Sequence, residues 1–154
     1  MCALTLHPFL PILVAVTVSA QTAPTPKRAA LRWVPVPAVL PVGAKMAILT
    51  GDPAKAGPFT MFLAMPSGYR VGPHFHPTDE GVDVKKGMLL MGIGDVYDAS
   101  KLKPMQEGDR GSMPANVHHF GTTHGATVIL VTAMGPFVIN YVNPADDPQK
   151  QSKP

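Results

Sequence analysis

Glycine and proline are spread along almost the whole chain, and they restrict its possible folds more than any other feature. The sequence holds 14 glycines and 18 prolines among 154 residues, about a fifth of the chain. Proline removes a backbone donor and glycine weakens helices, so a helical bundle, a coiled coil and a doubly wound α/β fold are poor candidates. Hydrophobic residues still make up 45% of the chain, enough for a buried core. We therefore expect an all-β fold of short strands and tight turns.

Apolar, β-prone runs between the turn residues predict where the strands lie. We expect strands within residues 45–50, 58–65, 69–76, 81–86, 88–93, 126–134 and 136–142. A single helical turn is expected over residues 98–103. Three prolines within residues 32–41 allow that segment to pair only at the edge of a sheet. Short strands at this spacing indicate a β-sandwich or a small barrel.

The N-terminus has the pattern of a secretory signal peptide. Residues 6–20 form the most apolar run of the chain and carry no charge, and small residues precede Gln21. The run is too short for a comfortable membrane span, so we expect no stable membrane anchor. We predict a signal peptide over residues 1–20, cleavage near Ala20, and a secreted or periplasmic protein. A buried first strand is the alternative interpretation of this run.

Cleavage at that point would also remove the single cysteine, Cys2. Disulfides, thiol catalysis and cysteine-based zinc sites would then be excluded from the mature protein. We interpret residues 21–39 as a proline-rich linker and N-terminal edge segment, 40–143 as the folded domain, and 144–154 as a flexible C-terminal tail. The formal net charge is only +3, and its basic residues are scattered without interleaved aromatic residues, so we expect no nucleic-acid partner.

Five of the six histidines fall between His74 and His124, and histidine is the commonest metal ligand in proteins. His74 and His76 are two residues apart, so on a strand both imidazoles project from one face. Glu80 follows four residues later, and residues 77–79 could turn the chain so that the next strand returns beside the histidines. Two imidazoles and a carboxylate bind a divalent first-row metal well. Asp79 is a competing carboxylate.

The segment from Gly68 to Gly87 resembles the first motif of the cupin superfamily, Gly-x5-His-x-His-x3-4-Glu-x6-Gly, at every specified position. The segment from Gly108 to Thr123 resembles the second motif, Gly-x5-Pro-x-Gly-x2-His-x3-Asn, with two departures. Asn116 replaces a glycine, which is a mild change because asparagine tolerates a left-handed backbone. Thr123 replaces an asparagine that is not usually a ligand. The resemblance covers roughly residues 40–143.

This resemblance implies a double-stranded β-helix, also called a jelly-roll or cupin barrel, with one metal ion inside. Matched residue by residue, it implies four ligands: His74, His76, Glu80 and His119. The metal would be one divalent first-row ion, with Fe, Mn, Ni, Cu and Zn all open. His118 would point to the opposite face of its strand, and His124 would lie at a hairpin tip. Apolar residues would line the barrel, with these as candidates: Phe62, Met88, Leu90, Met91, Phe120, Ile129 and Val131.

In cupins such a site supports dioxygenases, isomerases, decarboxylases and binding proteins, so the fold alone does not fix the activity. We expect a small organic molecule as the partner and a dioxygenase-like oxidoreductase in which Glu80 is also catalytic. Tyr69, Arg70 and Thr123 are further polar candidates near the site. The alternative is a non-catalytic module that binds a small ligand or the metal itself. The resemblance also implies a possible homodimer.

Overall fold

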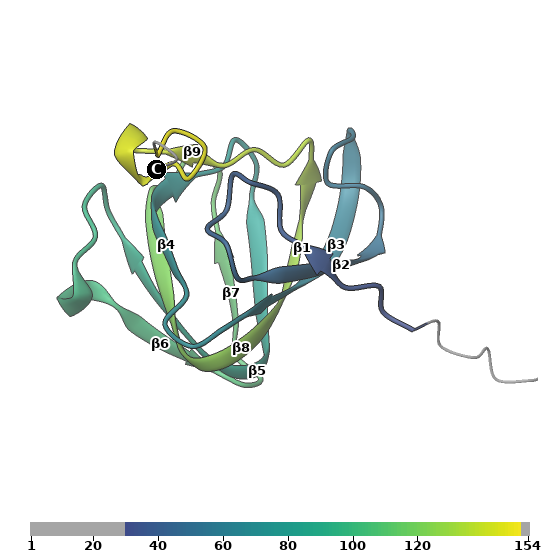
Figure 1. The fold of residues 1–154 in the computed structure, drawn as a ribbon, viewed down its shortest axis with the longest axis horizontal. Helices are drawn as coiled ribbons and strands as arrows, with labels where there is room; N and C mark the ends of the chain where they lie inside the picture. Colours follow the sequence, from purple (N-terminus) through teal and green to yellow (C-terminus); the bar gives the residue numbers. More distant parts are fainter. Residues whose placement is uncertain (1–29, 152–154) are drawn as a thin grey trace, which may run out of the picture.

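The computed structural model describes residues 30–151, and this part of the chain folds into nine strands and two short 3-10 helices (Figure 1). In chain order the elements are β1 (Val34–Pro35), β2 (Lys45–Thr50), β3 (Gly57–Met65), β4 (Arg70–Phe75), β5 (Glu80–Ile93), η1 (Ala99–Lys101), β6 (Lys103–Gln106), β7 (Arg110–Met113), β8 (His119–Gly135), β9 (Asn140–Tyr141) and η2 (Pro144–Asp146). The predicted signal peptide lies outside the described residues. Within them, no helix is long and apolar enough to cross a membrane.

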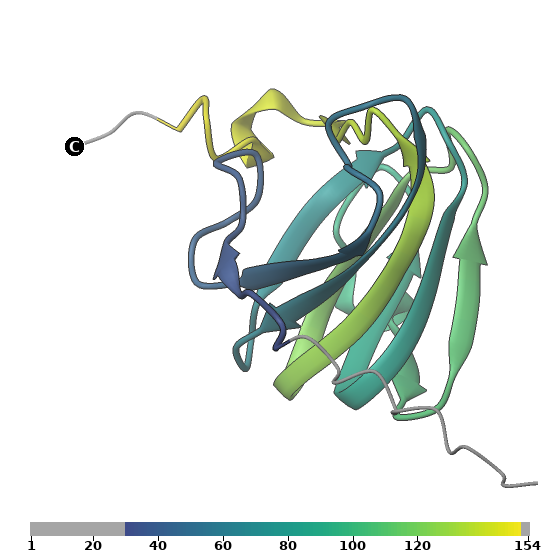
Figure 2. The same cartoon turned by 90° about the vertical axis from the view of Figure 1, so that its right-hand side faces the viewer.

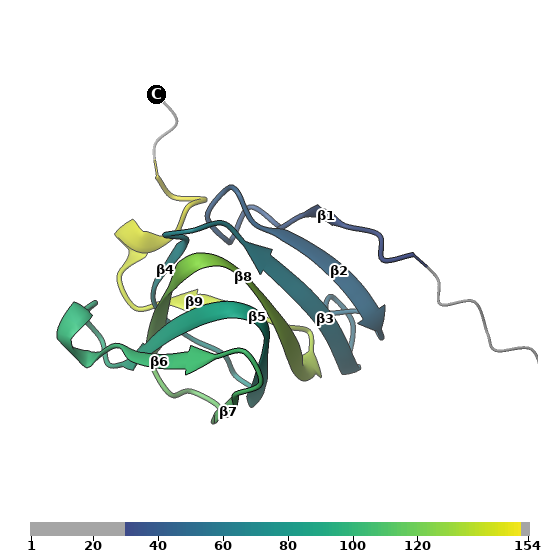
Figure 3. The same cartoon turned by 90° about the horizontal axis from the view of Figure 1, so that it is seen from below.

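All strands belong to one antiparallel sheet that curls on itself (Figures 2 and 3). The 17-residue strand β8 is its centre. Strands β3 and β4 follow one another along one edge of β8, and the 14-residue strand β5 pairs with its other edge. Strands β6 and β7 in turn pair with β5. The fold is therefore all-β, a curled half-barrel of the jelly-roll type, as predicted.

The concave face of the sheet holds the core. Along β3 the buried and partly exposed residues alternate, so that Phe59, Met61, Leu63 and Met65 all point inward. Successive side chains of a strand point to opposite faces, which explains this pattern. The four side chains belong to one cluster of buried residues that also contains Ile129 and Val131 of β8 and Val82 of β5, among others. The curled sheet thus wraps around its own apolar face.

Both ends of the described chain lie against the sheet. Strand β1 pairs only with β2, so the proline-rich segment sits at an edge as predicted. Near the C-terminus, the Tyr141 hydroxyl donates a hydrogen bond to the Val39 carbonyl at 2.8 Å. Helix η2, within the stretch predicted as a flexible tail, begins at an Asn143 cap and contacts β4. Residues 144–146 therefore pack beside the barrel.

Several predicted boundaries are wrong. The two expected strands 81–86 and 88–93 are one strand, because the chain passes Gly87 through a register shift against β8 and does not turn there. Strand β8 begins at His119, whereas the prediction placed its start at residue 126. Only Asn140 and Tyr141 form a strand within the expected run 136–142. The predicted helical turn is present as η1, with Asp98 as its N-cap.

Candidate metal centre

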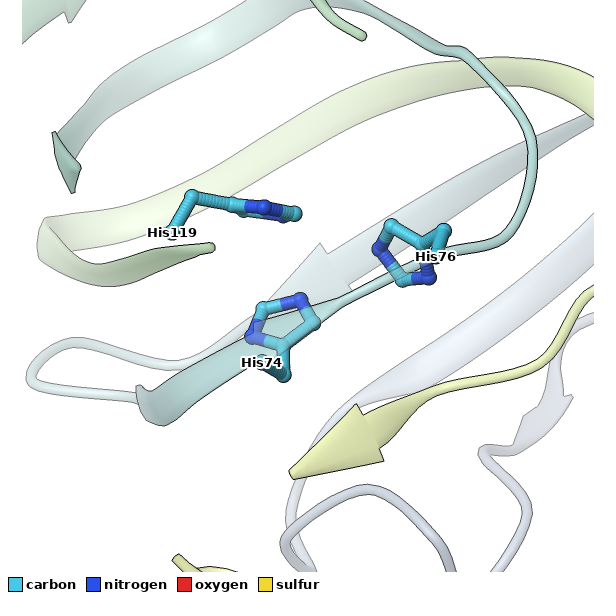
Figure 4. A group of neighbouring side chains, drawn as sticks. All are labelled: His74, His76 and His119. Atoms are coloured by element: carbon cyan, nitrogen blue, oxygen red, sulfur yellow. The ribbon is translucent and has the colours of Figure 1, made fainter. Parts of the chain in front are cut away.

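Three buried histidines meet on the concave face, and they come from two neighbouring strands (Figure 4). His74 lies on β4, His76 follows the end of that strand, and His119 is the first residue of β8. His74 and His119 are directly paired across the two strands. All three side chains are buried, with at most 7% of each residue exposed. The ligand atoms offered by the three rings lie within 4.8 Å of one another.

Each of the three rings is oriented by a hydrogen bond from Nδ1 to a backbone carbonyl. The Nδ1 atoms of His74, His76 and His119 lie 2.8, 2.8 and 2.9 Å from the carbonyl oxygens of Gly72, Val138 and Val117, respectively. A carbonyl oxygen only accepts, so Nδ1 must carry the proton in each ring. In the neutral imidazole, Nε2 then keeps a free lone pair. Metal-binding histidines characteristically donate their other ring N–H to a carbonyl or carboxylate in this way.

The fit to a metal ion can be tested on one buried atom. His76 Nε2 is inaccessible to solvent and has no hydrogen-bond partner among the described residues. A buried polar atom without a partner is costly, and native structures have few of them. A metal ion would satisfy the lone pair of His76 together with those of His74 and His119. The donor set therefore fits a single metal ion.

Glu80 adds a carboxylate to this group. It is the first residue of β5 and is buried, with Oε2 3.6 Å from His76 Nε2 and 3.5 Å from His119 Nε2. The sequence predicted that β5 would return beside β4. That expectation is wrong, because β8 lies between the two strands and β5 pairs with its opposite edge. The curl of the sheet, and not a hairpin, brings Glu80 to the histidines.

Burial favours the neutral form of His74 and of His76. Desolvation is the main cause that lowers the pKa of His74 to about 3, and the neighbouring His119 and His76 contribute to the same shift. Desolvation also lowers the pKa of His76, although the Glu80 carboxylate opposes this shift. The close approach of His76 to Glu80 is thus a contact between a neutral ring and a carboxylate at neutral pH. Neutral imidazoles are the form that binds metal.

The other candidate ligands lie elsewhere. His118 points away from the three-histidine cluster, and its Nδ1 lies 2.6 Å from Asp95 Oδ1 while its ring stacks on Phe75. His124 is exposed on the continuous strand β8, so the predicted hairpin tip does not exist there. The Asp79 carboxylate accepts a hydrogen bond from the Ala115 amide at 2.8 Å.

The turn before β8 shows how the two departures from the cupin motifs are accommodated. Asn116 has a φ of +62°, so asparagine occupies the left-handed conformation expected of the replaced glycine. The backbone N–H of Asn116 donates a hydrogen bond to the His76 carbonyl at 2.7 Å, so this turn contacts one of the candidate ligands directly. The buried Thr123 hydroxyl accepts from the Tyr69 amide and donates to the Pro66 carbonyl. Thr123 therefore stabilises the connection between β3 and β4.

The histidines and Glu80 line a cavity of about 80 Å³ whose remaining walls are almost entirely apolar. Met91, Phe120, Ile129 and Val131 belong to the lining as predicted, whereas Phe62, Met88 and Leu90 do not. Phe62 faces outward and stacks on Trp33 at 6.3 Å between ring centroids. Met61 and Leu63 take its place in the wall. The sequence of β3 is apolar at both alternating sets of positions, so periodicity could not decide between them.

Phe137 was missed by sequence reasoning. Its ring stacks on His76 with the centroids 4.3 Å apart, and it lines the same cavity. No motif marks this residue, which lies in the irregular segment between β8 and β9. Of the polar candidates, Tyr69 lines the cavity but donates its hydroxyl to the Pro41 carbonyl at 2.6 Å, and burial raises its pKa to about 12. Arg70 is exposed and lies over the Tyr97 ring.

The curled jelly-roll sheet and its buried histidine cluster give the chain the fold of the cupin superfamily. Among similar solved structures is a candidate acetylacetone dioxygenase from Methylibium petroleiphilum, with a TM-score of 0.59, 20% identity, and coverage of 88% of this chain and 90% of that one. An RmlC-like cupin from Shewanella frigidimarina has a TM-score of 0.54 at 13% identity, over 73% and 91% of the chains. The polyketide cyclase RemF from Streptomyces resistomycificus has a TM-score of 0.57 at 17% identity, over 68% and 75%.

These similarities establish the fold. No family model matches the chain, and no curated protein matches it. The structure thus has the cupin fold and, among residues 30–151, a buried cluster of three histidines whose ligand atoms suit one metal ion.

Proposed function

We propose that this protein is a mononuclear-metal cupin that binds a small organic molecule beside the metal and acts as a dioxygenase-like oxidoreductase. The observation that carries the proposal is the shared orientation of three buried imidazoles. Each has Nδ1 fixed on a backbone carbonyl, and the three ligand atoms converge beside the Glu80 carboxylate. We assign His74, His76, His119 and Glu80 as the ligands.

A bound divalent ion would supply Lewis acidity and, if it were redox-active, a site for dioxygen. The chain itself supplies the surroundings. Glu80 brings the single negative charge among the four proposed ligands, so the centre would keep a positive charge that attracts an anionic group. The apolar walls lower the local dielectric constant and would strengthen electrostatic interactions inside the cavity. Glu80 is also the one carboxyl group that could hold a proton at the lining of this cavity.

β-Diketones are the first substrate class to test, since one of the similar structures is described as a candidate acetylacetone dioxygenase. The experiment is an oxygen-uptake screen against β-diketones, flavonols and catechols. The protein is reconstituted separately with Fe, Mn, Ni, Cu and Zn, and the metal content of each sample is measured. We expect uptake with at least one redox-active metal and none with Zn. The His119→Ala variant is the control and should lose both tight metal binding and uptake.

A non-catalytic binding module is the second candidate, and the cavity lining supports it. Among the residues that line the cavity, Glu80 carries the only carboxyl group, and the Tyr69 hydroxyl is committed to a backbone carbonyl. A chemical step that needs a separate acid and base would find few groups here. Stoichiometric metal with no oxygen uptake for any substrate class, combined with saturable binding of one of them, would favour this role.

Export is a separate proposal. The apolar, uncharged residues 6–20 and the small residues before Gln21 support secretion or periplasmic location after cleavage near Ala20. The test is mass spectrometry of protein recovered from its native cell together with fractionation of that cell. A mature chain that begins at Gln21 is expected, and an intact Met1 in the cytoplasmic fraction would overturn the proposal.

A further inference from the structure

A second hollow of about 480 Å³ lies on the sheet beside the metal cavity, within the size range of roughly 300–1,000 Å³ typical of small-molecule sites. We call it the β5–β7 cleft (Figure 3 shows these strands). It is lined by residues of β5, η1, β6 and β7: Val82, Met91, Gly92, Ile93, Lys101, Lys103, Met105, Arg110, Gly111, Ser112 and Met113. None of the four proposed ligands belongs to its lining.

Strand register connects this cleft with the metal cavity. Val82 and Met91 line both hollows, so the two share a wall on the concave face of β5. Lys103 is paired with Met91, and Met113 is paired with Glu80. Residues directly opposite each other on neighbouring strands point to the same face. Lys103 therefore projects from the face that also carries the proposed metal ligands.

The charges of the β5–β7 cleft all have one sign. Lys101, Lys103 and Arg110 are cationic, and no acidic residue belongs to the lining. Arg110 is partly neutralised, because its Nε lies 3.3 Å from Asp83 Oδ1. Among residues 30–151, by contrast, neither Lys101 nor Lys103 has a carboxylate within ion-pair distance of its ammonium group. The Asp95 carboxylate faces His118, whereas the Asp98 carboxylate accepts hydrogen bonds from Ser100, keeps its charge and attracts Lys101 beyond ion-pair distance.

The cleft thus combines an apolar floor with two ammonium groups that form no direct ion pair among residues 30–151. Val82, Met91 and Met105 offer a surface for a hydrocarbon body, and the lysines offer charge for one anionic end. The two features suit an amphiphilic organic anion and disfavour a neutral polar molecule, which would desolvate the lysines without pairing with them.

We propose that the β5–β7 cleft binds an organic carboxylate with an apolar body, held by Lys101 and Lys103 and directed along Val82 and Met91 toward the metal cavity. The cleft would then favour those substrates of the metal site that carry a carboxylate on an apolar body over uncharged ones. This preference among substrates rests on the proposed function of the metal site, whereas binding of a carboxylate in the cleft does not.

The test compares octanoate with octanamide, which have the same chain and differ in the charge of one end. Isothermal titration calorimetry measures both in the metal-free protein and in protein loaded with Zn²⁺, which is redox-inert. The variants are Lys103→Gln and Lys101→Gln, and Lys45→Gln on β2 is the matched control with an exposed lysine outside the cleft. All are exposed positions, and thermal melting checks that each variant is folded.

We expect octanoate to bind more tightly than octanamide in the metal-free and the Zn²⁺-loaded protein alike. Each cleft variant should weaken octanoate about three- to tenfold and leave octanamide unchanged, as the loss of one charge-assisted hydrogen bond predicts. Added salt should weaken octanoate only. Lys45→Gln should change neither ligand.

Two results would overturn the inference: equal binding of octanoate and octanamide, or a preference for octanoate that the cleft variants leave intact. A preference seen only with Zn²⁺ would mean that the carboxylate binds the metal. That result would leave the proposed function standing and remove the cleft from it. The reverse result, no metal uptake but lysine-dependent binding of octanoate, would reject the metal site and keep the cleft.

Discussion

The hydrogen bonds of three Nδ1 atoms are the residue-level feature on which the metal site depends. Because Gly72, Val117 and Val138 each present a carbonyl to one ring, the tautomer of every imidazole is fixed by the backbone. The conformational entropy of the three side chains is therefore lost when the chain folds and not when the metal binds. A preorganised donor set of this kind should bind metal without a rearrangement of the barrel.

The neighbouring histidines His118 and His119 give the sharpest single-residue test. His119 lies in the buried cluster, whereas His118 is bound to Asp95 on the outside. His119→Ala should abolish tight metal binding, and His118→Ala should leave the affinity within about tenfold of the parent, in the range of outer-sphere changes. Metal titration with a competing chelator measures both. The opposite pattern would mean that His118, and not His119, is the metal ligand from this part of the chain.

A substitution at Glu80 can distinguish a role in metal binding from a role in catalysis. Glu80→Gln keeps the size of the side chain and one oxygen donor but removes the charge beside His76 and His119. Metal affinity should fall by about tenfold or more. If the protein is an enzyme, turnover at full metal occupancy should fall as well, because the carboxylate would no longer hold a proton. Both quantities are measured in metal-saturated protein, and unchanged turnover there would remove Glu80 from the mechanism.

At the scale of the elements, glycine allows β5 to bend without ending. Gly87 has a φ of +79°, and the register of β5 against β8 shifts on both sides of Lys86. The Thr127 hydroxyl fills this irregularity, since it accepts a hydrogen bond from the Met88 amide and donates to the Met88 carbonyl. The bend lets one long strand carry both Glu80 and the wall of the β5–β7 cleft.

Alanine substitutions at Gly87, in the bend of β5, and at Gly68, between β3 and β4, distinguish backbone strain from a steric clash of the added Cβ. A Cβ at Gly87 would lie 2.5 Å from the Ala126 carbonyl oxygen, whereas a Cβ at Gly68, with a similar φ of +74°, would meet nothing within 4 Å. Gly68→Ala should therefore cost about 1–2 kcal/mol of unfolding free energy, the price of a left-handed alanine. Gly87→Ala should cost clearly more. Urea unfolding measures both, and equal losses would contradict the collision.

The same elements show what the sequence could and could not predict. The all-β class and the positions of His74, His76 and His119 followed from glycine and proline spacing and from two local motifs. The sequence predicts a break between two strands at Gly87. The structure has a bulge there, and a bulge is defined by pairing with β8, a strand far along the chain. The route of Glu80 to the site was wrong for the same reason. Strand order depends on contacts between distant segments, which local patterns do not encode.

For the molecule as a whole, the buried histidines link the site to stability. The folded protein keeps His74 neutral with a pKa of about 3, while an unfolded chain protonates it near its ordinary value of 6.5. Between these values the unfolded state binds more protons than the folded state, so the unfolding free energy falls as the pH falls. The slope for one such group is at most about 1.4 kcal/mol per pH unit. His76, whose pKa is also lowered, acts in the same direction.

We therefore expect metal-free protein to lose stability progressively from pH 6.5 toward pH 4. The Asp52, Asp83 and Asp98 carboxylates do not account for this window, because their lowered pKa values place their contribution below 3.8. Urea unfolding at pH 4, 5, 6 and 7 measures the slope. His74→Gln removes one titrating group and should flatten it, whereas substitution of the exposed His124 by Gln should not. A slope that is the same in all three proteins would show that acid destabilises the barrel elsewhere than at the histidine cluster.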